Sequence, residues 1–135
     1  MTSNHLVIER FVTILILAAG LSHVLQPARW CALFADLLAR PYAALVIGTL
    51  TLPLGLAIVL THNVWLLDWA VIVTIMGWGW TIKSCLYLVA PSALNRWRDQ
   101  CTGPRGERKL VRVGSVMVVV ALAMTWRFFL QPVAT

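Results

Sequence analysis

Four long apolar runs dominate the pattern of hydrophobic and polar positions along the chain, and short polar segments separate them. A bilayer core about 30 Å thick requires roughly 20 residues of helix at about 1.5 Å per residue. We therefore expect four transmembrane helices, over residues 6–26, 42–60, 64–90 and 111–130. Helices are expected rather than strands, because an open strand would leave backbone donors and acceptors without partners in hydrocarbon.

The polar segment after the first run, PARWCALFADLLARP, has a periodicity of its own. Arg29, Asp36 and Arg40 share one helical side. The opposite side is apolar and carries Trp30, Leu33, Phe34 and Leu37. This pattern predicts an amphipathic helix at residues 28–39 that lies in the membrane interface.

The polar segment before the last run contains Gly103, Pro104 and Gly106, which predict a loop. Taken together, these elements predict an all-α polytopic membrane protein with a single domain over residues 1–135. Its four transmembrane helices are expected to form two antiparallel hairpins, to which the short cytoplasmic interfacial helix is added.

Composition and charge agree with a membrane location. Hydrophobic residues make up 60% of the chain and charged residues 12%, and the mean hydropathy is +0.82, outside the usual range of soluble domains. The net charge of +6 does not indicate nucleic-acid binding, because the basic residues lie in short connections without interleaved aromatic residues. The bilayer is the expected partner, and no nucleic acid is expected.

Most basic residues fall on one side of the predicted membrane. That side carries Arg29, Arg40, Arg96, Arg98, Arg105, Arg108, Lys109 and Arg112. Only Arg10 and Arg127 flank the other side. The positive-inside rule therefore predicts cytoplasmic basic loops, with both chain termini outside the cytoplasm.

Two of the runs place small residues on one side. Gly48, Thr51 and Gly55 do so in the second run and predict a close contact with a neighbouring helix. In the third run, at 100° per residue, the corresponding side carries Thr74, Gly77, Trp78, Thr81, Cys85 and Leu88. The opposite side, expected to face lipid or another protein, carries Trp65, Trp69, Ile72, Met76, Trp80, Lys83 and Tyr87.

Lys83 is the unusual member of that side. Its long side chain can extend to the headgroups above Tyr87, or it can contact a lipid phosphate or a carboxylate of a partner protein. We take Lys83, Trp80, Trp69 and Tyr87 as candidate contacts for a partner or for lipid.

The connection THNVWLLDW offers a candidate outward-facing polar site of His62, Asn63 and Asp68, with Glu9 and His5 as further candidate members. The structural alternative explains the same residues by helix capping and an aromatic belt. In that alternative the cap is Thr61 or Asn63, Asp68 faces the positive end of the helix dipole, and the belt consists of Trp65 and Trp69.

His23 lies near the opposite end of the first run and is a candidate solute or ligand contact. It differs in depth from His62 by most of the bilayer, so these two histidines are not expected to bind one metal or haem together. The separated Cys31, Cys85 and Cys101 predict neither a disulfide framework nor a zinc site. A nucleophile with a base, a phosphate loop and paired catalytic carboxylates are all missing from the sequence, so no enzyme, metal or cofactor is expected.

Residues 55–91 contain HNVW, then T-x-x-GW, then a lysine before a closing proline. In these features the segment resembles a family of small bacterial four-span inner-membrane proteins without known activity. Gly79-Trp80 and Ser84 depart from the family pattern, in which one aromatic residue and a glycine are expected. The resemblance implies a bacterial inner membrane, and hence periplasmic termini.

The leading expectation for function is a non-enzymatic accessory or structural subunit that associates with a membrane complex or with itself. The alternative is a homo-oligomeric transporter or channel for a small solute. A third hypothesis is a haem- or quinone-binding redox subunit, which would use the histidines and tryptophans.

Overall fold

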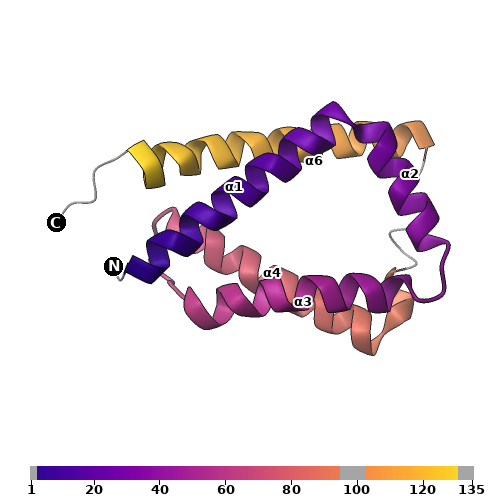
Figure 1. The fold of residues 1–135 in the computed structure, drawn as a ribbon, viewed down its shortest axis with the longest axis horizontal. Coiled ribbons are helices and arrows are strands. Elements are labelled where there is room, and N and C mark those ends of the chain that lie inside the picture. The colour runs from indigo at the N-terminus through magenta and orange to yellow at the C-terminus, as the bar shows by residue number, and fades with distance from the viewer. Residues whose placement is uncertain (1–2, 95–102, 131–135) are drawn as a thin grey trace.

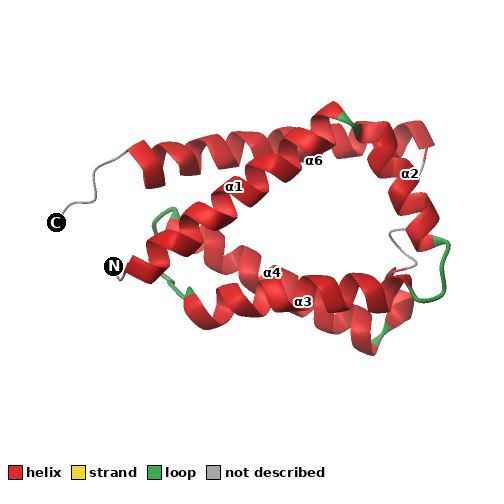
Figure 2. Ribbon diagram, viewed as in Figure 1, coloured by secondary structure: helices red, strands yellow, loops and turns green. Residues whose placement is uncertain are grey.

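A computed structural model describes residues 3–94 and 103–130, and its described residues form helices without any strand (Figure 2). The elements are α1 (Ser3–Leu25), α2 (Pro27–Leu38), α3 (Ala43–Thr61), α4 (Ala70–Val89), η1 (Pro91–Leu94), α6 (Gly103–Thr125) and η2 (Trp126–Leu130). Four stretches are long and apolar enough to cross a membrane, namely α1, α3, α4 and α6 continued by η2. The expected all-α class with four spans is confirmed.

The four spans form two antiparallel pairs, α3 with α4 and α1 with α6 (Figure 1). The pairs approach each other at the end that holds the start of α1, residues 62–69 and η2, which we call the terminal end. They diverge toward the other end, where α2 runs across from one pair to the other. We call this second end the α2 end.

Glycines allow the helices of each pair to approach closely. A Cβ added to Gly55 of α3 would lie 2.7 Å from the backbone nitrogen of Thr81 in α4. In the other pair, a Cβ added to Gly114 of α6 would lie 2.8 Å from the carbonyl oxygen of Gly20 in α1. The close contact expected at Gly55 is therefore present, and its partner is α4.

A hydrogen bond between two hydroxyl groups adds to the α3·α4 contact. Thr51 Oγ1 and Ser84 Oγ lie 2.6 Å apart, and each lies 2.7 Å from a carbonyl oxygen of its own helix, Ile47 and Trp80 respectively. One hydroxyl therefore donates across to the other, which in turn donates to the carbonyl of its own helix. Satisfying these groups inside the pair matters because hydrocarbon offers them no alternative partner.

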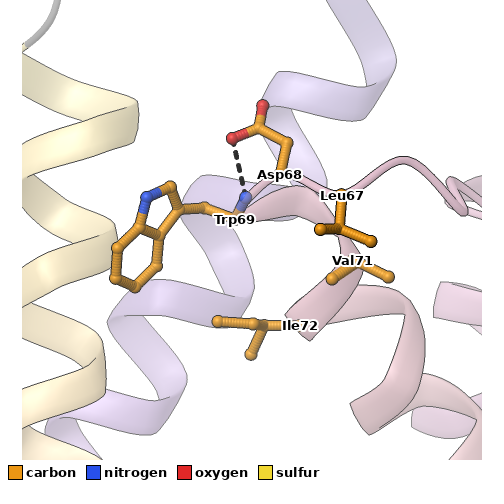
Figure 3. Close-up of a pocket in the computed structure, with 5 residues that line it drawn as sticks. All are labelled: Leu67, Asp68, Trp69, Val71 and Ile72. Carbon is orange, nitrogen blue, oxygen red and sulfur yellow. Dashed lines mark hydrogen bonds between the residues drawn. The ribbon is translucent and has the colours of Figure 1, made fainter.

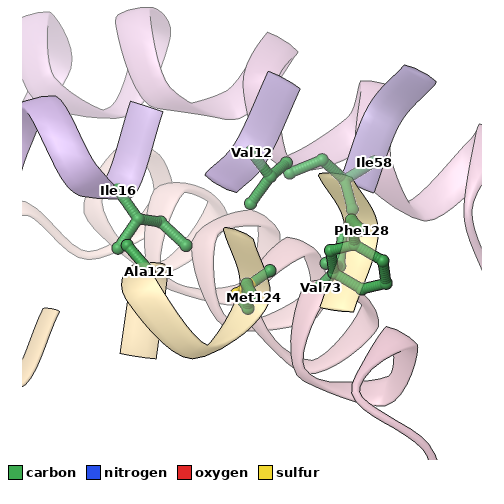
Figure 4. Close-up of a cluster of buried hydrophobic side chains, with 7 residues drawn as sticks. All are labelled: Val12, Ile16, Ile58, Val73, Ala121, Met124 and Phe128. Carbon is green, nitrogen blue, oxygen red and sulfur yellow. The ribbon is translucent and has the colours of Figure 1, made fainter. Parts of the chain in front are cut away.

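A buried apolar cluster joins the two pairs near the terminal end (Figure 4). It draws side chains from all four spans and from η2, namely Val12, Ile16, Ile58, Val73, Ala121, Met124 and Phe128. A second, smaller cluster near the α2 end consists of Ala43, Ala44 and Tyr87, with Leu37 and Leu38 of α2 packed against it. A helix is present at the expected residues 28–39, as α2.

Two expected boundaries are wrong. Residues 64–69 precede α4 instead of opening it, because Thr74 Oγ1 accepts from the Val64 N–H at 3.1 Å and donates to the Val64 carbonyl at 3.0 Å. Neither Thr61 nor Asn63 caps α4, since the helix begins only at Ala70.

The loop expected around Gly103, Pro104 and Gly106 is helical instead and forms the start of α6. A proline in the first turn of a helix loses no backbone hydrogen bond, so Pro104 is compatible with this helix.

Candidate functional site

A fully buried polar cluster lies at the terminal end, where the two helix pairs meet. Glu9 of α1, His62 at the end of α3 and Thr74 of α4 each have 0% exposure. His62 Nε2 lies 3.0 Å from Glu9 Oε1, and His62 Nδ1 lies 3.2 Å from Thr74 Oγ1. Three elements that are distant in the sequence thus contribute one continuous hydrogen-bonded network.

The positions of these side chains follow from the local backbone. His62 closes the last turn of α3 through its N–H, which donates to the Ile58 carbonyl at 2.7 Å. Thr74 lies one turn inside α4 and holds the backbone of the preceding connection through Val64. These bonds hold the connection beside α4, and the imidazole of His62 lies against Glu9 of α1.

One atom of the network has no partner. Glu9 Oε2 is buried and accepts no hydrogen bond in the described part of the chain. The ring of His5, one turn before Glu9, lies 5.4 Å from the ring of His62 and is partly exposed. A buried carboxylate oxygen without a donor is costly, so this atom can accept a hydrogen bond from a further donor.

The structure divides the candidate outward-facing site of His62, Asn63 and Asp68. It joins His62 to Glu9 and His5, which were the further candidate members. The Asn63 side-chain oxygen instead accepts from the indole N–H of Trp65 at 2.8 Å and of Trp78 at 3.3 Å.

Asp68 belongs to a separate, partly exposed ion pair. Its Oδ2 lies 3.2 Å from Arg127 Nη2 of η2, and its Oδ1 accepts from the Trp69 N–H at 2.7 Å. Beside it is a shallow hollow of about 350 Å³, lined by Leu67, Asp68, Trp69, Val71 and Ile72. Figure 3 shows Trp69 directed to one side of the chain, with Leu67 and Val71 on the other. The hollow is open and lacks converging polar groups, so it does not form a binding site with the network.

The expected orientation of α4 requires correction. Trp80 packs against the apolar cluster between the pairs, and Tyr87 is buried against α3, whereas Trp69 is 43% exposed. Lys83 is half-buried and makes no hydrogen bond or ion pair with any described residue. The side of α4 that is exposed carries Ile75, Trp78, Ile82, Leu86 and Val89.

The physical reason is that α4 has two neighbours. The sequence pattern accounts for the small residues that contact α3, and the structure adds a contact with the α1·α6 pair on the adjacent side of the helix. The buried arc is consequently wider than the small-residue side, and it includes Trp80 and Tyr87.

His23 lies near the α2 end, as expected, and has a clear structural environment. Its Nδ1 lies 2.6 Å from the Ala19 carbonyl oxygen, and its ring stacks on Trp30 of α2 with centroids 4.5 Å apart. The Trp30 indole N–H donates to Ser22 Oγ at 2.9 Å. These contacts fix α2 across the end of α1, at the opposite end of the molecule from His62.

The buried network contains residues that sequence reasoning undervalued. Glu9 is an acid inside an apolar run, which is itself a signal of function in a membrane protein. The adjacent Arg10 does not pair with it, because Arg10 donates to the Phe128 carbonyl at 3.1 Å. From its place on the small-residue side of the third run, Thr74 is expected only to pack against a neighbouring helix. No group of three histidine, cysteine, aspartate or glutamate side chains in the described ranges is arranged to hold a metal ion.

Comparison with protein-family models, with curated proteins and with solved structures gave no match. The resemblance of residues 55–91 to a family of small inner-membrane proteins therefore stays a prediction from the sequence.

Proposed function

We propose that the protein is a non-enzymatic membrane subunit that associates with itself or with a larger membrane complex. The observation that carries this proposal is how little of each span the chain covers. In the most apolar window of each span, the share of residues buried inside the structure is 28% for α1, 28% for α3, 33% for α4 and 22% for α6. The pairs also diverge away from the terminal end (Figure 1).

The exposed side of α4 is the best candidate for the contact. Its five large residues, Ile75 to Val89, recur at intervals of three and four, the spacing with which one helix packs lengthwise against another. Gly79 lies at the edge of this side, and a Cβ added there would have no neighbour within 4 Å. A transmembrane helix of a partner, or of a second copy, fits this apolar surface.

Extraction in a mild detergent tests the association. We expect stoichiometric co-purification with another membrane protein, or a homo-oligomer by mass. Gly79→Leu should reduce the recovered complex severalfold, because it fills the exposed side without touching the chain's own fold. Val116→Leu, on the exposed side of α6, is the matched control. A lone monomer under these conditions would contradict the proposal.

We also propose that the α2 end faces the cytoplasm of a bacterial cell and that the termini are periplasmic. The described basic residues support this orientation, with Arg10 and Arg127 at the terminal end and the others near the α2 end or, for Lys83, within α4. A reporter that works only in the periplasm is expected to be active when it is fused behind Thr135. Activity of a cytoplasm-specific reporter at that position would reverse the orientation.

A second candidate, a homo-oligomeric transporter or channel for a small solute, is favoured by one observation. Glu9 is a fully buried carboxylate within a span, paired with His62 between two helix pairs that diverge toward the other end. Flux in proteoliposomes that disappears in folded Glu9→Gln protein would support transport. The third hypothesis, a haem or quinone subunit, has less support, because both ring nitrogens of His62 and Nδ1 of His23 already have partners.

A further inference from the structure

Within the described residues, two polar side-chain contacts join the α1·α6 pair to the α3·α4 pair, and both lie at the terminal end. The Arg127–Asp68 pair has side chains that are 31% and 37% exposed, so solvent can take over its charges when the contact opens. The His62–Glu9 pair has side chains that are both 0% exposed. The second contact is shielded from solvent, so it depends more strongly than the first on how many protons its two groups hold together.

Counting donors and acceptors identifies the arrangement that suits the closed structure. With both ring nitrogens of His62 protonated, Nε2–H donates to Glu9 Oε1 and Nδ1–H donates to Thr74 Oγ1. The Thr74 hydroxyl then accepts from the Val64 N–H and donates to the Val64 carbonyl, so its hydrogen-bonding capacity is used completely. One carboxylate and one imidazolium also leave the buried site without net charge.

We propose that Glu9 and His62 form a proton-binding site between the two helix pairs, which His5 connects to the terminal surface. One proton, shared in the His62–Glu9 contact, holds the pairs together. A second proton from solution binds Glu9 Oε2, the acceptor that has no donor. Because the imidazolium then loses its counter-charge in a buried site, the terminal end opens and admits water.

The other ionisable groups nearby do not substitute for this pair. On α1, Arg10 donates to the Phe128 carbonyl, and its guanidinium lies 5.0 Å from the centroid of the Phe129 ring. From residues 62–69 and η2, Asp68 and Arg127 bind each other. On α4, the nearest charged residue is Lys83, about 13 Å beyond Thr74 by helix rise. His5 is the remaining group beside the His62 ring, and it is the partly exposed one.

The composition of the chain provides a direct test. Glu9 and Glu107 are its only glutamates, and His5, His23 and His62 its only histidines. Protein in lipid nanodiscs, labelled with ¹³C at glutamate carboxyls and with ¹⁵N at histidine rings, can be followed by NMR from about pH 4 to 9. His5→Asn and His23→Asn assign the histidine signals, and Glu107 and His23 serve as internal controls at the α2 end.

We expect each titration step of the pair to shift the Glu9 and His62 signals together, because the protons belong to the pair and not to one residue. In Glu9→Gln protein, which keeps a hydrogen-bonding side chain of the same size, the His62 signal should lose the step that it shares with Glu9. The His23 curve should not change.

Hydrogen exchange of the backbone amides in residues 62–69 tests the opening. Exchange in the wild type, corrected for the intrinsic pH dependence of amide exchange, should rise by about tenfold or more when Glu9 takes up its second proton. The side chain of Glu9→Gln mimics the protonated carboxyl, so at that pH this variant should exchange about as fast as the wild type. A corrected wild-type exchange rate that does not change with pH would contradict the opening. The site itself is contradicted if Glu9 titrates independently of His62, or if neither signal changes across the range, and both results are read from the wild-type protein once its signals are assigned. None of these outcomes depends on the proposed association with other subunits.

Discussion

Within each helix pair the closest contacts are at glycines, whereas the contact between the pairs includes ionisable side chains that bind each other. At Gly55 and Gly114, the position of an added Cβ is already occupied by the backbone of the neighbouring helix. Between the pairs, the polar contacts are Glu9 with His62 and Asp68 with Arg127. The first kind of contact has one close-packed arrangement, and the second kind changes when a proton is gained or lost.

This difference indicates two rigid units and one adjustable junction. The glycine contacts extend along the pairs, while the polar contacts are confined to the terminal end. At the α2 end, the pairs are linked by α2, which is fixed to α1 through Trp30 and Ser22. A change at the junction should therefore alter how the pairs meet, without separating the helices inside either pair.

The largest effect is expected from His62→Ala, which breaks the junction. Removing the imidazole leaves Glu9 buried without the one side-chain partner that it has in the described ranges, so the free energy of unfolding should fall by about 3 to 5 kcal/mol. Asn63→Ala, at an exposed neighbouring position, should change it by about 0.5 kcal/mol or less. Unfolding in detergent micelles, followed by circular dichroism, measures both. Similar losses in the two variants would show that the buried pair has no special role.

A smaller effect is expected from Gly55→Ala, which acts inside a pair. The added methyl group meets the backbone of Thr81, which cannot rotate away, so the loss should be about 1 to 3 kcal/mol. Gly79→Ala is the matched control, because its methyl group meets nothing and alanine is the better helix former. The same unfolding measurement should show Gly79→Ala as neutral or slightly stabilising. A loss in Gly79→Ala as large as in Gly55→Ala would contradict the close contact.

The smallest effect is expected at the partly exposed ion pair. Asp68→Asn should lower the free energy of unfolding by about 1 kcal/mol or less, and added salt should reduce this difference. Arg127→Gln should have a similar effect, and the double variant should lose little more than either single variant. A double-variant cycle at low and high salt measures this coupling. A salt-independent loss as large as that of His62→Ala would remove the distinction between the two polar contacts.

Much of the fold was predictable because it depends on local sequence. The lengths of the apolar runs indicated four spans, and the periodicity after the first run indicated α2. The glycines of the second run indicated a close helix contact. The start of α4 was misjudged, since Thr74 holds the Val64 backbone outside the helix and no local pattern encodes that bond.

The candidate site was predictable only in part. His62, Glu9 and His5 were all noticed as polar residues near one end of the spans, and the structure brings them together. Asn63 and Asp68, which are nearer to His62 in sequence, have other partners. Sequence proximity was misleading here because the connection turns His62 inward toward α1 and turns Asn63 outward.

By itself, the sequence determined that this chain is helical and apolar enough to cross a bilayer four times, because length and hydrophobicity decide insertion segment by segment. Only the tertiary structure decided which helices are neighbours, which side of α4 is covered, and that Glu9 meets a histidine 53 residues away. The reason is that pairing between spans depends on matching surfaces and on the pairing of buried polar atoms, and both are properties of two helices together.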